Sequence, residues 1–225
     1  QFKELKLDSR ILKSIIKSGF SIPTEIQSKA IPVVLSGADL MASAQTGTGK
    51  TAAFVLPALH LLLDSAKTSG KGPRVLILTP TRELAVQVNK NIVDFSRFLK
   101  IPTGSILGGM PYGPQFRMLK KPLDLLVATP GRLLDHIERG KINLSRVEIL
   151  ILDEADRMLD MGFVDAVKDI AIKTPKSRQT LLFSATLEGR VLKIANQIQK
   201  KPISIALASN NERHKLINQC MYHAD

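Results

Sequence analysis

Apolar residues along the chain fall into two patterns, short unbroken runs and longer stretches with helical spacing. The unbroken runs are bounded by polar or turn residues and lie at Val75–Leu78, Leu125–Val127, Ile149–Leu152 and Leu181–Phe183. Such runs predict strands that are buried on both faces, as in parallel sheets. Helices are expected between them, over 82–98, 131–139, 163–172 and 188–199, with a weaker strand at 104–107. The alternation predicts an α/β fold, a mostly parallel sheet with helices on both faces.

Two further helices are expected before the first strand. One covers residues 7–19, with Asp8 as its cap. The second follows Thr24 and runs to about Leu35, because Thr24 and Gln27 have the spacing of a capping box. Capping is a sufficient structural explanation for Gln27, although an amide has enough donors and acceptors to serve a second partner.

A glycine-rich stretch follows the apolar run Leu40–Ala42 and leads into a helical segment near Ala52. Its sequence is Ala44-Gln45-Thr46-Gly47-Thr48-Gly49-Lys50-Thr51. Strand, glycine-rich loop and helix in this order are typical of a P-loop, whose backbone N–H groups bind phosphates. Lys50 would neutralise the β- and γ-phosphates of a nucleotide, and the Thr51 hydroxyl would bind Mg²⁺. An ordinary turn is the alternative, and Ala44 stands where the general P-loop pattern has glycine.

Two features interrupt the apolar pattern after this stretch. Pro57 is expected to kink or end the helix, which would resume at Leu59–Leu63. Residues 64–73 are polar and contain Ser, Lys, Gly and Pro, which predicts a solvated loop.

Groups suited to binding anions follow three of the predicted strands. They are Thr79-Pro80-Thr81-Arg82-Glu83, Gly108-Gly109 and Thr129-Pro130-Gly131-Arg132. Thr followed by Pro is also an ordinary helix start, with a cap and then a first residue. However, helix N-termini beside Arg bind phosphates, and the formal net charge of +12 favours polyanionic partners. These segments could therefore follow a nucleic-acid backbone without reading its bases.

An acidic segment, Asp153-Glu154-Ala155-Asp156, follows the strand at Ile149–Leu152. Acidic residues at a helix start need no functional explanation. In a P-loop protein, however, a carboxylate directly after a buried strand occupies the Walker B position. Asp153 would hold Mg²⁺ and Glu154 would orient and deprotonate the attacking water. The hydroxyls of Ser184 and Thr186, at the end of the next strand, could hydrogen-bond Asp156.

Composition narrows the class of protein further. The sequence has no run of about 18 apolar residues and no signal-like N-terminus, so we expect a cytoplasmic protein without a membrane partner. Cys220 is the only cysteine in the sequence. It excludes an internal disulfide and a Cys-rich metal site, and it fits a reducing compartment.

The segment Asp153–Asp156 spells the signature of the DEAD-box RNA helicases, and the other stretches follow in that family's order. They resemble its Q motif (Phe20–Gln27, with Phe2 as the upstream aromatic), motif I (Ala44–Thr51), motif Ia (Pro80–Ala85), the GG motif (Gly108-Gly109), motif Ib (Thr129–Arg132) and motif III (Ser184–Thr186). Alanine at position 44 is usual in that motif I. The resemblance covers residues 2–206, and Arg157–Phe163 looks most like the bacterial branch concerned with ribosome assembly.

The resemblance implies a RecA-like P-loop domain over residues 1–206, with its Q-motif region at 1–28, that binds ATP and Mg²⁺. In the family, the residues matching Thr24 and Gln27 read the adenine edge, and the residue matching Phe2 packs on the ring. Asp156, Ser184 and Thr186 would link hydrolysis to strand separation.

RNA is the other partner that the resemblance implies, single-stranded or locally opened and bound with little sequence preference. The expected backbone contacts are Pro80, Thr81, Arg82, Gly108, Gly109, Thr129, Pro130, Gly131 and Arg132. Ribosomal or other RNP particles are candidate partners, and a monomer is expected.

The family works with two RecA-like domains, and the second supplies arginine fingers and half of the RNA site. The sequence has no His-Arg-x-Gly-Arg motif, and residues 207–225 resemble a linker and the first strand of that second domain. An arginine finger is worth roughly 10³–10⁵ in kcat. This chain alone is therefore expected to bind nucleotide, especially ADP or AMP, and to hydrolyse ATP very slowly.

Two other classes of protein stay open. A nucleotide-gated RNA clamp without catalysis is disfavoured because Lys50, Asp153 and Glu154 are all intact. A different P-loop motor, such as a DNA translocase, is disfavoured by the sequence around Gln27 and by Asp156.

Overall fold

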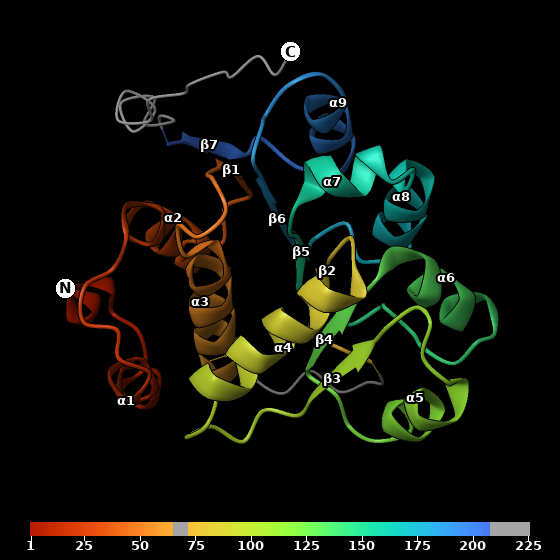
Figure 1. Ribbon diagram of the computed structural model, residues 1–225, viewed down its shortest axis with the longest axis horizontal. Helices are drawn as coiled ribbons and strands as arrows, with labels where there is room; N and C mark the ends of the chain where they lie inside the picture. The colour runs from red at the N-terminus through yellow and green to blue at the C-terminus, as the bar shows by residue number, and fades with distance from the viewer. Residues whose placement is uncertain (65–71, 208–225) are drawn as a thin grey trace, which may run out of the picture.

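A parallel sheet forms the centre of the protein in the computed structural model, which describes residues 1–64 and 72–207 (Figure 1). It has seven strands in the order β3-β4-β2-β5-β6-β1-β7, and all neighbours run parallel. The strands are β1 (Leu40–Ser43), β2 (Val75–Leu78), β3 (Thr103–Ile106), β4 (Leu125–Ala128), β5 (Ile149–Leu152), β6 (Gln179–Ser184) and β7 (Ile203–Ala206). The predicted parallel α/β sheet is confirmed.

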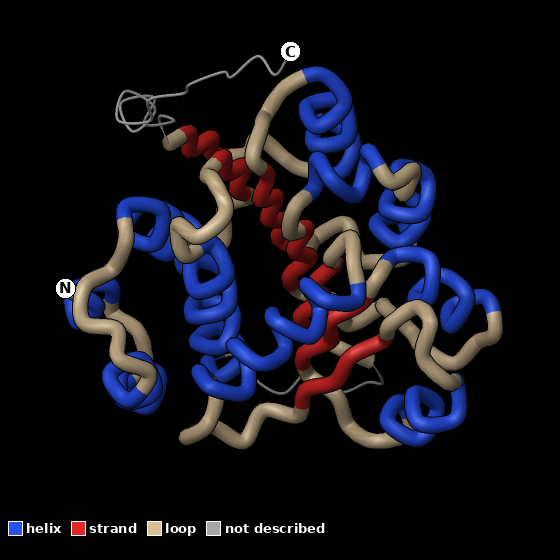
Figure 2. Tube along the Cα trace, in the orientation of Figure 1, coloured by secondary structure: helices blue, strands red, loops and turns tan. Residues whose placement is uncertain are grey.

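Helices cover both faces of this sheet (Figure 2). One face carries α1 (Ser9–Lys17), α2 (Glu25–Leu35), α3 (Lys50–Asp64) and α4 (Arg82–Phe95). The other carries α6 (Pro130–Glu138), α7 (Ala155–Asp160), α8 (Val164–Ile172) and α9 (Gly189–Ile198). The helix α5 (Tyr112–Leu119) lies beside the edge strand β3, and a 3₁₀ turn, η1 (Phe2–Leu5), precedes α1.

The strands β2, β4 and β5 are apolar at every position because both of their faces are covered. Along β2, Val75 and Ile77 belong to the core under α1–α4, whereas Leu76 and Leu78 belong to the core under α6–α9. All four side chains are fully buried. A strand with a hydrophobic core on each face needs apolar residues at every position, and this explains the unbroken apolar run in the sequence.

The caps of the first two helices are as predicted. Asp8 Oδ1 accepts from the Arg10 backbone N–H at 2.8 Å. Before α2, Thr24 Oγ1 accepts from the Gln27 N–H, and Gln27 Oε1 accepts from the Thr24 N–H at 3.0 Å, which completes the capping box.

The expectation that Pro57 could end the helix is wrong. The helix α3 runs from Lys50 to Asp64 with Pro57 inside it. A proline removes one backbone donor from a helix. The side chains of Phe54, Leu56 and their neighbours up to Leu59 are buried, and this burial outweighs the loss of one hydrogen bond.

The helix α4 begins at Arg82, as predicted. Its cap is Thr81, whose hydroxyl accepts from the Leu84 N–H at 3.3 Å, whereas Thr79 precedes the helix and donates to the Thr81 carbonyl. At α6 the expected order holds, with Thr129 as the capping residue and Pro130 as the first helical residue.

Three elements were not predicted, namely β7, α5 and α7. In β7 only Ile205 is buried, so its pattern gives a weak signal. The expectations for 207–225, and those for most of the loop at 64–73, lie outside the described residues. Within the described ranges no helix has both the length and the apolar character needed to cross a bilayer.

Candidate nucleotide and RNA site

The glycine-rich stretch lies at the carboxyl edge of the sheet, directly after β1. It is tied to the neighbouring β6, because the Ala44 N–H donates to the Ser184 carbonyl at 3.2 Å. Gly47 and Gly49 have φ of +82° and +90°, in the left-handed region that favours glycine. The loop ends at Lys50, the first residue of α3. An anion bound in the loop would therefore lie at a helix N-terminus.

A pocket of about 300 Å³ opens at this loop. Its lining comes from the predicted Q motif, the P-loop, the acidic segment and α4. The lining residues are Phe20, Gln27, Thr46, Gly47, Gly49, Lys50, Thr51, Ala52, Leu84, Gln87, Asn91, Phe95, Asp153 and Glu154. The volume lies at the lower end of the range of ligand clefts.

Gln27 joins the Q motif to the P-loop. Its Nε2 donates to the Gly49 carbonyl at 3.1 Å, and its Oε1 accepts from the Thr24 N–H. The side chain is buried, with 3% exposed. An amide keeps a second N–H and a second lone pair after these bonds, which are the groups that pair with the amine and N7 of adenine.

Lys50 and Asp153 are buried charges on the same pocket. The Lys50 ammonium donates to the Ala44 carbonyl at 2.8 Å. Burial raises the pKa of Asp153 to about 7, although Lys50 works in the opposite direction. Asp153 follows β5, and its backbone N–H donates to the Leu78 carbonyl, which holds the carboxylate at the strand end.

The oxygen atoms of Thr51 and Asp153 fit a magnesium ion that is held mainly by a nucleotide. Both residues line the pocket and offer the hard donors that Mg²⁺ prefers. Among the described residues no group of three or more His, Cys, Asp or Glu side chains could hold a metal. An ion held by these two residues would take phosphate oxygens and water as its remaining ligands.

Glu154 has an unusual backbone conformation, with φ 53° and ψ 53°. A residue other than glycine in this left-handed region is strained by about 1 kcal/mol or more, and such strain concentrates at functional sites. The conformation turns the chain from β5 into α7. Glu154 Oε2 accepts from Arg157 at 3.3 Å, and the residue lines the nucleotide pocket.

The predicted hydrogen bond between the Ser184 hydroxyl and Asp156 is present. The Ser184 hydroxyl accepts from the Asp156 backbone N–H at 3.3 Å, and the Asp156 carboxylate accepts from the Ala185 N–H at 3.1 Å. Thr186 is exposed, and no hydrogen bond to Asp156 is found for it among the described residues. The link between the two segments therefore runs through backbone groups.

A second group of predicted residues meets at the loop after β3. We call residues 107–111 the glycine loop. The Gly108 N–H donates to Thr129 Oγ1 at 3.0 Å, and an Arg132 nitrogen donates to the Met110 carbonyl at 2.6 Å. Side chains at the start of α6 therefore hold the loop that follows β3.

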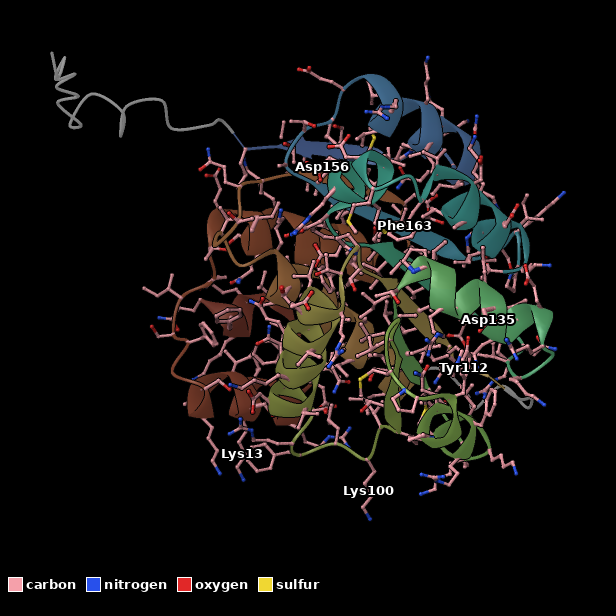
Figure 3. All side chains as sticks on the ribbon, turned by 45° about the vertical axis from the view of Figure 1, so that its right-hand side comes forward. Lys13, Lys100, Tyr112, Asp135, Asp156 and Phe163 are labelled. Carbon is pink, nitrogen blue, oxygen red and sulfur yellow. The ribbon has the colours of Figure 1, made fainter. Side chains whose placement is uncertain are left out.

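The start of α4 lies beside the same loop. Gly109 has φ +70°, and a side chain built on it would lie 3.9 Å from an Arg82 nitrogen. A Cβ added to Gly131 would lie 3.9 Å from the Phe163 ring. Figure 3 labels Phe163. The structure thus brings together the predicted RNA contacts from three separate segments, including Pro80 and Thr81 at the start of α4.

Phe2 does not lie at the pocket. It is 5% exposed and belongs to the hydrophobic core, whereas Phe20 is 48% exposed and lines the pocket. The Phe20 ring lies 6.1 Å from that of Phe95. Thr24, Ala44, Gln45 and Thr48 also lie outside the lining.

The sequence reasoning missed the contribution of α4 to the pocket. The four lining residues are Leu84, Gln87, Asn91 and Phe95. Their spacing of three or four residues places them on one side of a helix. That spacing is the signal that could have identified them, but only the fold puts this side of α4 beside the P-loop.

A parallel sheet with a P-loop after one strand and an acidic pair after another defines a RecA-like P-loop domain for binding nucleotides. Residues 24–194 match the family model described as DEAD/DEAH box helicase. The chain belongs to this family.

Curated relatives and solved structures agree with this assignment. The chain is 45% identical to ATP-dependent RNA helicase SrmB of Haemophilus influenzae and 44% identical to that of Escherichia coli, over 100% of its own length in both cases. It spans 52% and 51% of these relatives, which is about half of their length. The crystal structure of a DEAD box protein from Methanococcus jannaschii matches 91% of this chain and 55% of that one, with 41% identity and a TM-score of 0.84.

Proposed function

We propose that this chain is the ATP-binding RecA-like domain of an ATP-dependent RNA helicase that separates RNA strands or remodels RNP particles. The observation that carries the proposal is the meeting of Lys50, Asp153 and Glu154 in one pocket. The glycine loop and Arg82 lie together at the strand ends, so a site for an anionic chain accompanies the nucleotide pocket.

Adenine selection is assigned to Gln27. Its amide is fixed by the capping box and by Gly49, so its free donor and acceptor are held in one orientation. Guanine shares the N7 acceptor but has the O6 acceptor where adenine has its amine donor, so the free acceptor of Gln27 would have no partner. A base bound here would also lie near the exposed Phe20 ring.

Hydrolysis is assigned to Lys50 and Glu154. The Lys50 ammonium neutralises the β- and γ-phosphates, and the Glu154 carboxylate accepts a proton from the water that attacks the γ-phosphorus. Thr51 and Asp153 would hold a magnesium ion beside the nucleotide, and this ion would supply neutralisation of the charge on the phosphate oxygens. The buried position of Lys50 and Asp153 strengthens their electrostatic effect.

RNA binding is assigned to Arg82, Arg132, Thr129 and the glycine loop. Arginines and backbone N–H groups suit phosphates and sugars, which predicts little sequence preference. The resemblance of Arg157–Phe163 to the branch concerned with ribosome assembly supports the further proposal that the RNA target belongs to a ribosomal or other RNP particle.

A second RecA-like domain is proposed to complete the site. Residues 1–206 would form the first domain, and 207–225 would lead into the second. Without arginines from that domain, the chain alone should bind ADP or ATP but hydrolyse ATP slowly.

The test compares the ATPase rate of this chain with that of the intact helicase that carries it, with and without single-stranded RNA. We expect RNA-stimulated turnover only in the intact protein. Glu154→Gln in the intact protein should lower kcat by at least about 10²-fold while nucleotide affinity is kept. RNA-stimulated turnover by the chain alone would contradict the split site.

The nucleotide-gated clamp is the second candidate, and the same experiment separates the two. Bound nucleotide without turnover in the intact protein would favour the clamp. Competition between ATP and GTP tests the assigned role of Gln27, because Gln27→Ala should reduce the preference for ATP. RNA and DNA strands of equal length, compared as activators, test the substrate class.

A further inference from the structure

A buried pair of side chains, Gln115 and His136, anchors the glycine loop. Gln115 Nε2 lies 3.2 Å from the Leu107 carbonyl and 3.4 Å from the Pro111 carbonyl, and it donates to both ends of the loop. His136 Nε2 lies 3.0 Å from Gln115 Oε1. Because Oε1 can only accept, His136 is the donor in this pair. The loop is therefore anchored through α5 to α6.

His136 is suited to this anchoring role because it is neutral. The side chain is completely buried, and burial lowers the pKa of the imidazole. The rings of Tyr112 and Phe116 lie 5.7 and 5.2 Å from it. The side chains that anchor the ends of the loop are therefore themselves packed against aromatic rings.

Arg132 holds the middle of the glycine loop and lies on an aromatic ring. Its guanidinium donates to the Met110 carbonyl at 2.6 Å, and its central carbon lies 4.2 Å from the centre of the Tyr112 ring. A cation over a tyrosine face at this distance is attracted by the ring. The guanidinium retains further N–H donors that can bind a phosphate.

Tyr112 is itself fixed by several neighbours. Figure 3 labels Tyr112 on α5 and Asp135 on α6, close to one another. The Tyr112 hydroxyl, and after it Arg139, holds the pKa of Asp135 below its usual range. The Arg139 guanidinium lies 4.9 Å from the same ring, and Phe116 packs beside it at 5.7 Å. These neighbours therefore fix the Tyr112 ring that the Arg132 guanidinium contacts.

We propose that Tyr112 is a positioning residue for RNA binding. Its ring keeps the Arg132 guanidinium against the glycine loop, in the orientation that donates hydrogen bonds to an RNA phosphate. The inference rests on the proposed function, since it assigns Arg132 to the RNA backbone. The ring restricts a flexible side chain before RNA arrives, so less conformational freedom is lost on binding. Tyr112 contacts neither the P-loop nor the acidic segment in the described structure, so its effect should be confined to RNA.

The experiment measures RNA affinity, its salt dependence and ATPase kinetics in the intact helicase. Tyr112→Leu keeps an apolar side chain beside Phe116 and His136 but removes the π face. We expect about fivefold weaker RNA binding, as the loss of one cation–π contact implies. The slope of log affinity against log salt should fall by about 0.7, the value for one phosphate contact on a single strand. The kcat at saturating RNA should be unchanged.

Rescue and coupling distinguish positioning from a general packing role. Tyr112→Phe keeps the ring and should restore both the affinity and the slope. In the Arg132→Ala background, Tyr112→Leu should add nothing, because its effect is exerted through Arg132. Lys141→Gln is a matched control, since it removes a cation 5.5 Å from the Phe116 ring without touching the glycine loop, and it should match the wild type.

Two results would overturn the inference. One is wild-type RNA affinity and slope in Tyr112→Leu, and the other is an equal loss in the presence and absence of Arg132. A wild-type protein that neither binds RNA nor responds to it would overturn the proposed function, and the inference with it. Binding by the wild type together with additive effects of the two substitutions would overturn the inference alone.

Discussion

Glycine is required at position 49 for two independent reasons. Its φ of +90° is strained for other residues, and an added Cβ would lie 2.4 Å from Gln27 Nε2. The second reason is tertiary, because Gln27 reaches the loop from α2. Gly47 shares only the first reason, since its φ is +82° and no atom lies within 4 Å of an added Cβ.

This difference supports a prediction for a matched pair of variants. Gly47→Ala should lower the free energy of unfolding by about 1 kcal/mol, the cost of the backbone strain. Gly49→Ala should lower it by a larger amount and should also weaken ATP binding, because the Gln27 amide must move. Thermal unfolding and nucleotide titration measure both effects. Equal losses in the two variants would show that the contact with Gln27 is unimportant.

Asp153 predicts a dependence of stability on pH in the absence of nucleotide and metal. Its pKa is raised from 3.8 to about 7 in the folded protein, mainly by burial. The native state therefore binds more protons than the unfolded state between these values, so the free energy of unfolding falls as pH rises through this window.

Asp153→Asn removes this titration. The variant should match the wild type near pH 4 and exceed it at pH 8 by at least about 1 kcal/mol, since one pKa unit corresponds to 1.36 kcal/mol. Denaturant unfolding at several pH values measures the difference. The opposite sign would mean that Lys50 stabilises the ionised form more than burial destabilises it.

At the scale of elements, the sheet edge at β7 depends on side chains outside the strand. Asp39, just before β1, accepts from the Thr180 and Lys200 backbone N–H groups, both at 2.7 Å. Gln199 donates to the Leu40 carbonyl at 2.8 Å and to the Thr180 carbonyl at 2.9 Å. These bonds join β1, β6 and the segment before β7 at the amino end of the sheet.

We therefore predict that Asp39→Ala destabilises the chain and loosens β7. The buried Thr180 N–H would lose its acceptor, at a cost of about 1–3 kcal/mol, and the partly buried Lys200 N–H would add a smaller loss. Hydrogen exchange should accelerate first for the amides of β7. Asp165→Ala, which removes an exposed acid from the first turn of α8, should cost less than about 1 kcal/mol. Equal effects of the two substitutions would refute the special role of Asp39.

For the molecule as a whole, the net charge of +12 should contribute to the proposed RNA binding together with specific contacts. If Arg82 and Arg132 both meet phosphates, the affinity of the intact helicase for single-stranded RNA should fall at least about fivefold between 50 and 200 mM salt. Titrations at several salt concentrations measure the slope. A flat response would mean that phosphates are not the main contact.

Much of the site was predictable because its signals are local. The P-loop, the acidic segment and the capping box depend on residue types at fixed spacing within one element boundary. The local rule that proline can end a helix failed at Pro57, because burial of the surrounding side chains keeps α3 continuous through one missing donor.

The sequence by itself determined the strands other than β7, the order of the motifs and the expected class of chemistry, since unbroken apolar runs and glycine spacing have few alternative structures. Only the tertiary structure decided which groups meet. It placed α4 beside the P-loop, buried Phe2 in the core and laid Arg132 on Tyr112. The physical reason is that these contacts join segments far apart in the chain, and their partners are chosen by the packing of helices on a shared sheet.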